Sequence, residues 1–108
     1  MIFIFGGLGQ GQEEYARKYD QENRLLDYHL IIREWMKQGK DPMEETKVYL
    51  KTHPEAVIVS TEIGCGVVPL DAFEREYREA VGRVCCYLAG EAKKVIRVMC
   101  GIGMVIKE

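Results

Sequence analysis

The chain has 108 residues, of which 47% are hydrophobic and 30% are charged, and its formal net charge is −2. This length and composition predict one small globular domain over residues 1–108. The sequence has no basic block, no apolar run of the roughly 18 residues that a membrane span needs, and no basic flank before its apolar first residues. It therefore predicts a cytoplasmic protein that binds neither nucleic acid nor a membrane and carries no signal peptide.

The first part of the chain is typical of the opening of a βαβ unit. Residues 2–5 are an apolar run that ends in glycines, as a strand buried on both faces does. Residues 12–22 are rich in helix formers, and Tyr15, Ala16 and Tyr19 give this predicted helix an apolar stripe.

Residues 24–38 are compatible with two structures. The periodicity favours one amphipathic helix, but a short strand around Leu25 and Leu26 followed by a helix from about Leu30 fits nearly as well. A further helix is expected to begin after Asp41 as its cap, with Pro42 at its first position, and to run to about residue 52.

The second half predicts a strand at 56–60, a loop at 61–69, a long helix at 70–90 and a strand at 94–100. The segment Gly101-Ile102-Gly103 is expected to turn the chain into a last strand at 104–107. Alternating strands and helices predict an α/β domain with a mostly parallel sheet. The four cysteines are Cys65, Cys85, Cys86 and Cys100, and none of them forms a C-x-x-C pair, which argues against a zinc site. They are expected to be small buried apolar residues in a reducing cytoplasm.

The loop FGGLGQGQEE at residues 5–14 has the glycine spacing of a phosphate-binding loop, G-x-x-x-x-G-K-[ST]. Gln12 stands where that loop has its lysine, and Glu13 stands where it has its serine or threonine. Three readings stay open: a strand-to-helix turn, weakened nucleotide binding, and true phosphoryl transfer. The candidate nucleotide-binding residues are Gly6, Gly7, Leu8, Gly9, Gln10, Gly11, Gln12 and Glu13.

Residues 60–84, STEIGCGVVPLDAFEREYREAVGRV, resemble the adenosylcobinamide kinase / adenosylcobinamide-phosphate guanylyltransferase family of cobalamin biosynthesis. Residues 60–69 are similar to the family's T-N-E-V-G-x-G-[IL]-V-P motif. The following helix is similar to R-x-[FY]-R-[DE]-x-x-G-R-x-N-Q, and the matching positions are Arg75, Tyr77, Arg78, Glu79, Gly82 and Arg83. Cys85 and Cys86 stand where the family has Asn-Gln.

The resemblance implies a small three-layer, P-loop-NTPase-like α/β domain with a C-terminal antiparallel strand. It implies GTP or ATP with Mg as cofactors, a corrinoid ligand, a homo-oligomer that is a trimer, and Asp27 as a metal ligand. The chain is shorter than the family, and the missing region carries the family's guanylylated histidine. Neither His29 nor His53 stands in that context. We therefore expect a member with weakened nucleotide binding and little or no catalysis, or a non-catalytic regulatory or scaffold protein that binds a full-length homologue.

The remaining candidates each have a structural alternative. In the second loop, Glu62, Gly64, Gly66 and Pro69 follow a presumed parallel strand, and Glu62 is a candidate base, metal ligand or structural acceptor. The long helix carries three candidate arginines, Arg75, Arg78 and Arg83. They are predicted either to contact a phosphate or a neighbouring subunit, or to form ion pairs with nearby glutamates at helical spacing. Trp35 and Met36 are expected in the core or an interface.

Overall fold

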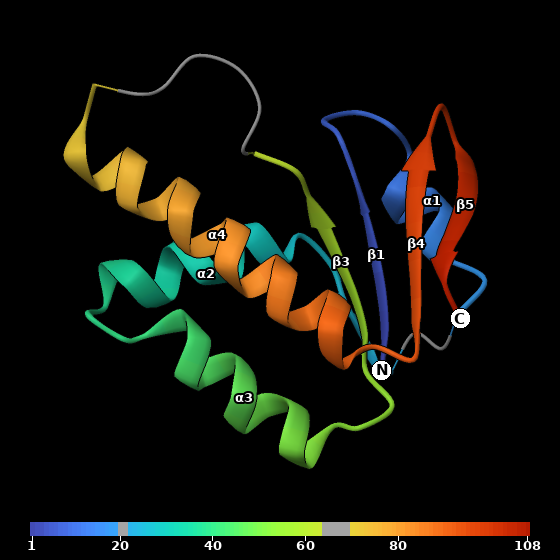
Figure 1. The fold of residues 1–108 in the computed structure, drawn as a ribbon, viewed down its shortest axis with the longest axis horizontal. Helices are drawn as coiled ribbons and strands as arrows, with labels where there is room; N and C mark the ends of the chain where they lie inside the picture. Colours follow the sequence, from blue (N-terminus) through green and yellow to red (C-terminus); the bar gives the residue numbers. More distant parts are fainter. Residues whose placement is uncertain (20–21, 64–69) are drawn as a thin grey trace.

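The sheet of this protein has the strand order β2-β3-β1-β4-β5 in a computed structural model that describes residues 1–19, 22–63 and 70–108 (Figure 1). The elements of this part of the chain are β1 (Ile2–Gly6), α1 (Gln12–Ala16), β2 (Arg24–Leu25), α2 (Tyr28–Lys37), α3 (Pro42–Thr52), β3 (Val57–Thr61), α4 (Ala72–Glu91), β4 (Lys94–Met99) and β5 (Ile102–Lys107). Strands β2, β3, β1 and β4 are parallel, and β5 runs antiparallel to β4. The predicted α/β class, with its mostly parallel sheet and antiparallel last strand, is confirmed.

Helices cover both faces of the sheet, which gives three layers (Figure 1). Helices α2, α3 and α4 lie over one face, where Phe3 and Ile58 pack against α4 residues such as Val84 and Leu88. The shorter α1 lies on the other face, where Ala16 packs on Ile4. Strands β1 and β3 are therefore apolar on both faces, as their continuous hydrophobic sequences predict.

Residues 24–38 form a short strand and a helix, which decides between the two predicted structures. The break is at Asp27, whose φ of 52° places it in the left-handed region. Helix α1 is shorter than the predicted 12–22, because the chain tightens into turns after Ala16. The backbone oxygen of Ala16 accepts hydrogen bonds from Tyr19 N and from Arg24 Nη1, both at 3.0 Å.

The predicted cap of α3 is confirmed, since Asp41 Oδ1 accepts a 3.0 Å hydrogen bond from Met43 N. The last turn lies earlier than predicted. Cys100 and Gly101 have φ values of 50° and 77°, so these two residues form the turn and β5 begins at Ile102. Two successive positive φ angles match the twist of a two-residue hairpin. Within the described residues, no helix is both long and apolar enough to cross a bilayer.

Candidate functional site

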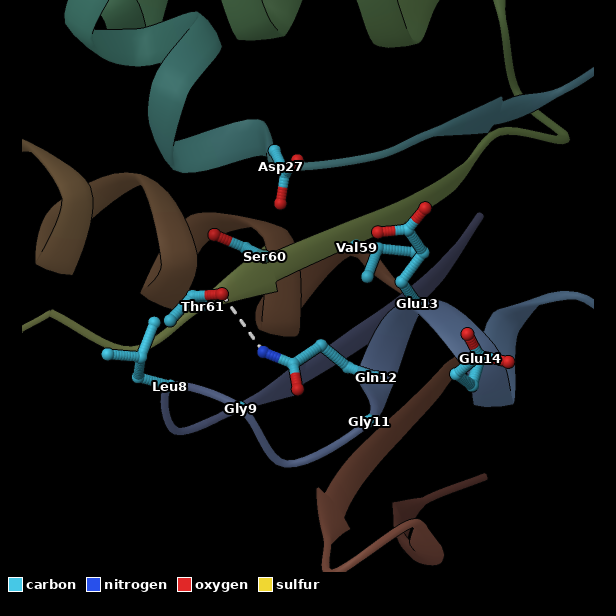
Figure 2. Close-up of a pocket in the computed structure, with 10 residues that line it drawn as sticks. All are labelled: Leu8, Gly9, Gly11, Gln12, Glu13, Glu14, Asp27, Val59, Ser60 and Thr61. Carbon is cyan, nitrogen blue, oxygen red and sulfur yellow. Dashed lines mark hydrogen bonds between the residues drawn. The ribbon is translucent and has the colours of Figure 1, made fainter.

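A pocket of about 370 Å³ lies where β1 and β3 end, beside the glycine loop (Figure 2). It is lined by Leu8, Gly9, Gly11, Gln12, Glu13, Glu14, Asp27, Val59, Ser60 and Thr61. The connection from β1 leads past β3 to β2, and the connection from β3 leads past β1 to β4, so the two leave this point in opposite directions along the sheet. Ligands of open α/β sheets bind at the carboxyl ends of strands at this kind of point.

The glycine loop has the backbone freedom that its sequence predicts. Gly9 and Gly11 have φ values of 72° and 90°, which favour glycine. A Cβ at Gly6 would lie 2.6 Å from the backbone oxygen of Val98, so only glycine fits between β1 and β4 there. The loop is also fastened to the hairpin turn, because Cys100 N donates to Gln10 Oε1 at 2.9 Å and Gly101 N donates to Gln10 O at 2.7 Å.

Gln12 stands where the G-x-x-x-x-G-K-[ST] pattern has its lysine, and the residue is buried, with 7% exposed. Its Nε2 donates to Thr61 Oγ1 at 2.9 Å, to Gly7 O at 3.1 Å and to Gly6 O at 3.3 Å. Figure 2 shows the amide nitrogen directed across the loop toward Thr61. The carboxamide therefore ties the loop to the end of β3. Its Oε1 is buried and accepts no hydrogen bond from the described residues.

The charges around the pocket are negative. The carboxylates come from Glu13, Glu14 and Asp27, and no lysine or arginine is among the described lining residues. Figure 2 shows the Asp27 carboxylate directed from the start of α2 toward the end of β3. A phosphate placed here meets backbone N–H groups but also three carboxylates, which oppose its charge.

The fit of a nucleotide with magnesium to this site is partial. The glycine backbone fits the close approach of a phosphate. Asp27 and Glu13 supply oxygen ligands of the type that magnesium takes. The Thr61 hydroxyl is already engaged by Gln12, and the described residues contain no cluster of three or more His, Cys, Asp or Glu side chains that would hold a metal ion. Magnesium would thus depend on ligands from the nucleotide and water.

Each of the two histidines contacts other residues of the fold. His29 Nδ1 accepts a 3.4 Å hydrogen bond from Thr61 N, so the ring is neutral at that nitrogen. Burial lowers the pKa of His29, and the nearby Asp27 carboxylate opposes that shift. His53 is exposed at the end of α3, stacked on Tyr49. Neither histidine lines the glycine-loop pocket.

Glu62 lies on a different cavity. Its backbone N donates to Gly6 O at 2.8 Å, and its Oε2 lies 3.7 Å from Arg97 Nη2. The cavity has a volume of about 230 Å³ between α4 and the sheet, and it is lined by Phe3, Phe5, Ser60, Thr61, Glu62, Cys85, Cys86, Ala89, Val95 and Ile106. Its apolar walls raise the pKa of the Cys85 thiol to about 11 through burial, partly offset by the Ser60 hydroxyl. The other predicted residues of that loop, Gly64, Gly66 and Pro69, lie outside the described residues, as does Cys65.

The three candidate arginines lie on α4, away from the glycine-loop pocket. Arg83 Nη1 is 3.7 Å from Glu79 Oε2, which is the predicted helical ion pair. Arg75 Nη1 donates to Leu70 O at 2.9 Å. Trp35 and Met36 pack against the core, as expected.

Sequence reasoning missed four residues of the pocket, which are Glu14, Val59, Ser60 and Thr61. Ser60 and Thr61 end a strand that was predicted to be parallel and central, and the ends of such strands carry ligand sites. That rule could have predicted these residues from the sequence. The hydrogen bond between Gln12 and Thr61 could not have been predicted, because it joins positions on two separate elements.

Comparison with known proteins places the chain in a family. Residues 20–106 match the family model described as cobinamide kinase / cobinamide phosphate guanyltransferase. The chain is 42% identical over 53 residues to the bifunctional adenosylcobalamin biosynthesis protein CobU of Escherichia coli (strain K12), and equally to that of Salmonella typhimurium (strain LT2). Each alignment covers 49% of this chain and 29% of the relative, so the chain matches less than a third of these relatives' length. Because the family model covers most of its residues, the chain belongs to the cobinamide kinase / cobinamide phosphate guanyltransferase family.

Proposed function

We propose that this protein acts in cobalamin biosynthesis as a family member whose glycine loop binds nucleotide weakly and whose catalysis is small or absent. The ligands are GTP or ATP with magnesium and a corrinoid of the cobinamide class. Family membership supports the ligand classes. A cytoplasmic location and a homo-oligomer, a trimer by resemblance, are parts of the same proposal.

The observation that carries the proposal is the state of Gln12. In a phosphate-binding loop the lysine at this position gives a positive charge to the β- and γ-phosphates. Here the side chain is neutral, buried and bonded to Gly6, Gly7 and Thr61. Phosphoryl transfer depends on fixed positive charge, so its loss lowers the rate by orders of magnitude.

The free backbone supports residual binding. Gly9 and Gly11 keep the angles that let N–H groups approach an anion, and Leu8 stands exposed at the loop's tip. Since Glu13 and Asp27 line the same pocket, binding should require magnesium to offset their charge. Nucleotide without magnesium is expected to bind more weakly still.

The test is a calorimetric titration of the purified protein with GTP and with ATP, each with and without magnesium. We expect weak binding that needs magnesium and that is abolished in Gly11→Asp, whose circular dichroism spectrum should match the wild type. If no heat is measured at millimolar nucleotide, the loop does not bind nucleotide and is only a strand-to-helix turn. Rapid phosphoryl transfer to adenosylcobinamide, or guanylylated protein after incubation with GTP, would contradict the catalytic part.

The alternative is a non-catalytic regulatory or scaffold protein that binds a full-length homologue. Exposed apolar side chains on the helical layer favour it, with Leu30 on α2 and Val48 on α3 at least half exposed. This function predicts a stable complex with a full-length family member that forms equally with and without nucleotide. Co-purification of the two proteins in the presence and absence of GTP separates it from the first proposal.

A further inference from the structure

The cavity under α4 exists because small side chains face the sheet there. Helix α4 contributes Cys85 and Ala89, which lie one turn apart on its inner face, and β3 contributes Ser60. The sheet below them carries Phe3 and Val95, which are buried with 2% and 1% exposed. Since three small side chains stand over this floor, a volume of about 230 Å³ is left between the helix and the sheet.

One polar group of this cavity has no hydrogen-bond partner among the described residues. Ser60 is 1% exposed, and its Oγ forms no hydrogen bond with any of them. Figure 2 shows this hydroxyl directed away from Gln12 and the glycine loop. Its polar neighbour is the Cys85 thiol, which is only a weak donor and acceptor. Most buried polar atoms are paired, and leaving one unpaired costs free energy that a bound molecule could recover.

The other walls of the cavity suit a flat, uncharged molecule. Phe3 and Phe5 stack with ring centroids 5.5 Å apart and an interplanar angle of 14°, so two aromatic rings line the cavity. Glu62 is the only charged residue among the described lining residues, and its carboxylate lies 3.7 Å from Arg97 Nη2. An anion in the cavity meets that carboxylate, and a cation competes with Arg97 for it. A neutral aromatic ring avoids both costs and packs against the two phenylalanines.

The volume of the cavity sets the size of its ligand. An apolar cavity of about 150 Å³ can hold benzene, so the 230 Å³ here suit one substituted ring or two fused rings.

The cavity is also held in shape from the side of β5. Ile106 of that strand lines it, and the next residue, Lys107, reaches the end of α4. There its Nζ donates to the backbone oxygens of Ala89 at 2.9 Å and Gly90 at 2.8 Å. Figure 1 shows β5 beside the far end of the sheet from α2 and α3, so these bonds are what join it to the helical layer. The space under α4 is therefore formed before any ligand enters.

We propose that the cavity between α4 and the sheet binds a small neutral aromatic compound that forms a hydrogen bond with Ser60 Oγ. The compound has one ring or two fused rings and carries a hydroxyl group or a ring nitrogen, since the serine hydroxyl both donates and accepts. A nucleotide carries charged phosphates and a corrinoid has four linked rings, so this ligand differs from both ligands of the proposed function. Its binding needs neither nucleotide nor magnesium.

The first experiment titrates the wild-type chain with phenol, toluene and indole by ligand-observed NMR, without nucleotide. We expect phenol and indole to bind with dissociation constants of about 1 mM or lower. Phenol and toluene have nearly the same shape, but only phenol can pair with Ser60. The variant Ser60→Ala should therefore weaken phenol binding about threefold or more and change toluene binding by less than about twofold. No described residue loses a hydrogen bond in this variant, so its thermal midpoint should equal or exceed that of the wild type.

A second variant tests the place of binding. Ala89→Leu fills part of the cavity and should abolish binding of all three compounds at millimolar concentration. Ala72→Leu is the matched control, because it makes the same change at the exposed first residue of α4 and should leave binding unchanged. Circular dichroism checks the fold of each variant. The proposal is overturned if no compound binds the wild type, if Ala89→Leu binds them as the wild type does, or if Ser60→Ala weakens phenol and toluene equally.

Discussion

The side-chain nitrogen of Gln12 donates a 2.9 Å hydrogen bond to the hydroxyl of Thr61, 49 positions later in the chain. It joins the first residue of α1 to the last residue of β3. The same nitrogen also holds the carbonyl oxygens of Gly6 and Gly7. A residue at the position of a phosphate-binding lysine therefore serves as an internal crosslink between loop and sheet.

Replacing Gln12 by alanine should destabilise the protein. It leaves the buried Thr61 hydroxyl and the Gly7 carbonyl without the donor they share, while Gly6 O keeps its hydrogen bond from Glu62 N. We expect the free energy of unfolding to fall by about 1–3 kcal/mol. Urea denaturation measures the change. Glu13→Ala is the control. Glu13 follows Gln12 directly in the chain but is exposed, so its replacement should change the free energy of unfolding by less than about 0.5 kcal/mol. Equal effects of the two substitutions would mean that the crosslink contributes nothing.

Giving the loop the lysine and serine of the G-x-x-x-x-G-K-[ST] pattern should strengthen nucleotide binding. The variant Gln12→Lys with Glu13→Ser replaces a neutral amide by a cation and removes one of the pocket's carboxylates. We expect the affinity for magnesium–ATP or magnesium–GTP to rise at least tenfold by calorimetry, which corresponds to about 1.4 kcal/mol.

The matched control for that variant is Gln12→Met with Glu13→Ser, which has a side chain of similar length and no charge at position 12. An affinity no better than that of the control would show that a cation at position 12 contributes nothing to nucleotide binding.

The fold could be predicted from the sequence because its signals are local. The apolar runs at β1 and β3, and the Asp41-Pro42 start of α3, each specify structure within a few residues. The end of α1 was not predicted. After Ala16 the chain turns, and the Ala16 oxygen accepts from Tyr19 N and from the side chain of Arg24, eight positions later; helix propensity does not report a contact with such a side chain.

The site could be predicted only in part, for the same reason. The glycine spacing pointed to the loop, and the family resemblance pointed to Asp27, whose carboxylate lines the same pocket. The acidic balance of the pocket depends on which side chains three separate elements bring together. Glu62, equally plausible in sequence, turned out to line the other cavity beside Arg97.

Stability should fall as the pH is lowered past about 6.5, the ordinary pKa of histidine. His29 Nδ1 accepts from Thr61 N, and burial lowers its pKa in the folded state. Between about 6.5 and that lower value the unfolded chain binds the proton and the folded chain does not, so acid favours unfolding there. The stabilisation is present above that window and is lost as the pH falls through it.

The measurement is the urea midpoint as a function of pH for the wild type and for His29→Asn. Asparagine keeps an acceptor for Thr61 N but does not titrate. Its midpoint should be flatter than that of the wild type from neutral pH down to about 5, above the range where carboxylates titrate. Two parallel curves would assign the pH dependence to other groups.

Adjacent cysteines on α4 should differ widely in reactivity. The thiolate is the reactive form, and a pKa of about 11 leaves roughly one Cys85 thiol in a thousand ionised at pH 8. Cys86 is exposed. Iodoacetamide should therefore label Cys86 at least tenfold faster than Cys85, as read by tandem mass spectrometry of the peptide, and Cys86→Ser should leave the slow labelling of Cys85 unchanged. Equal rates would mean that α4 lifts from the sheet during labelling, because Cys85 reaches the reagent only when the apolar cavity opens to water.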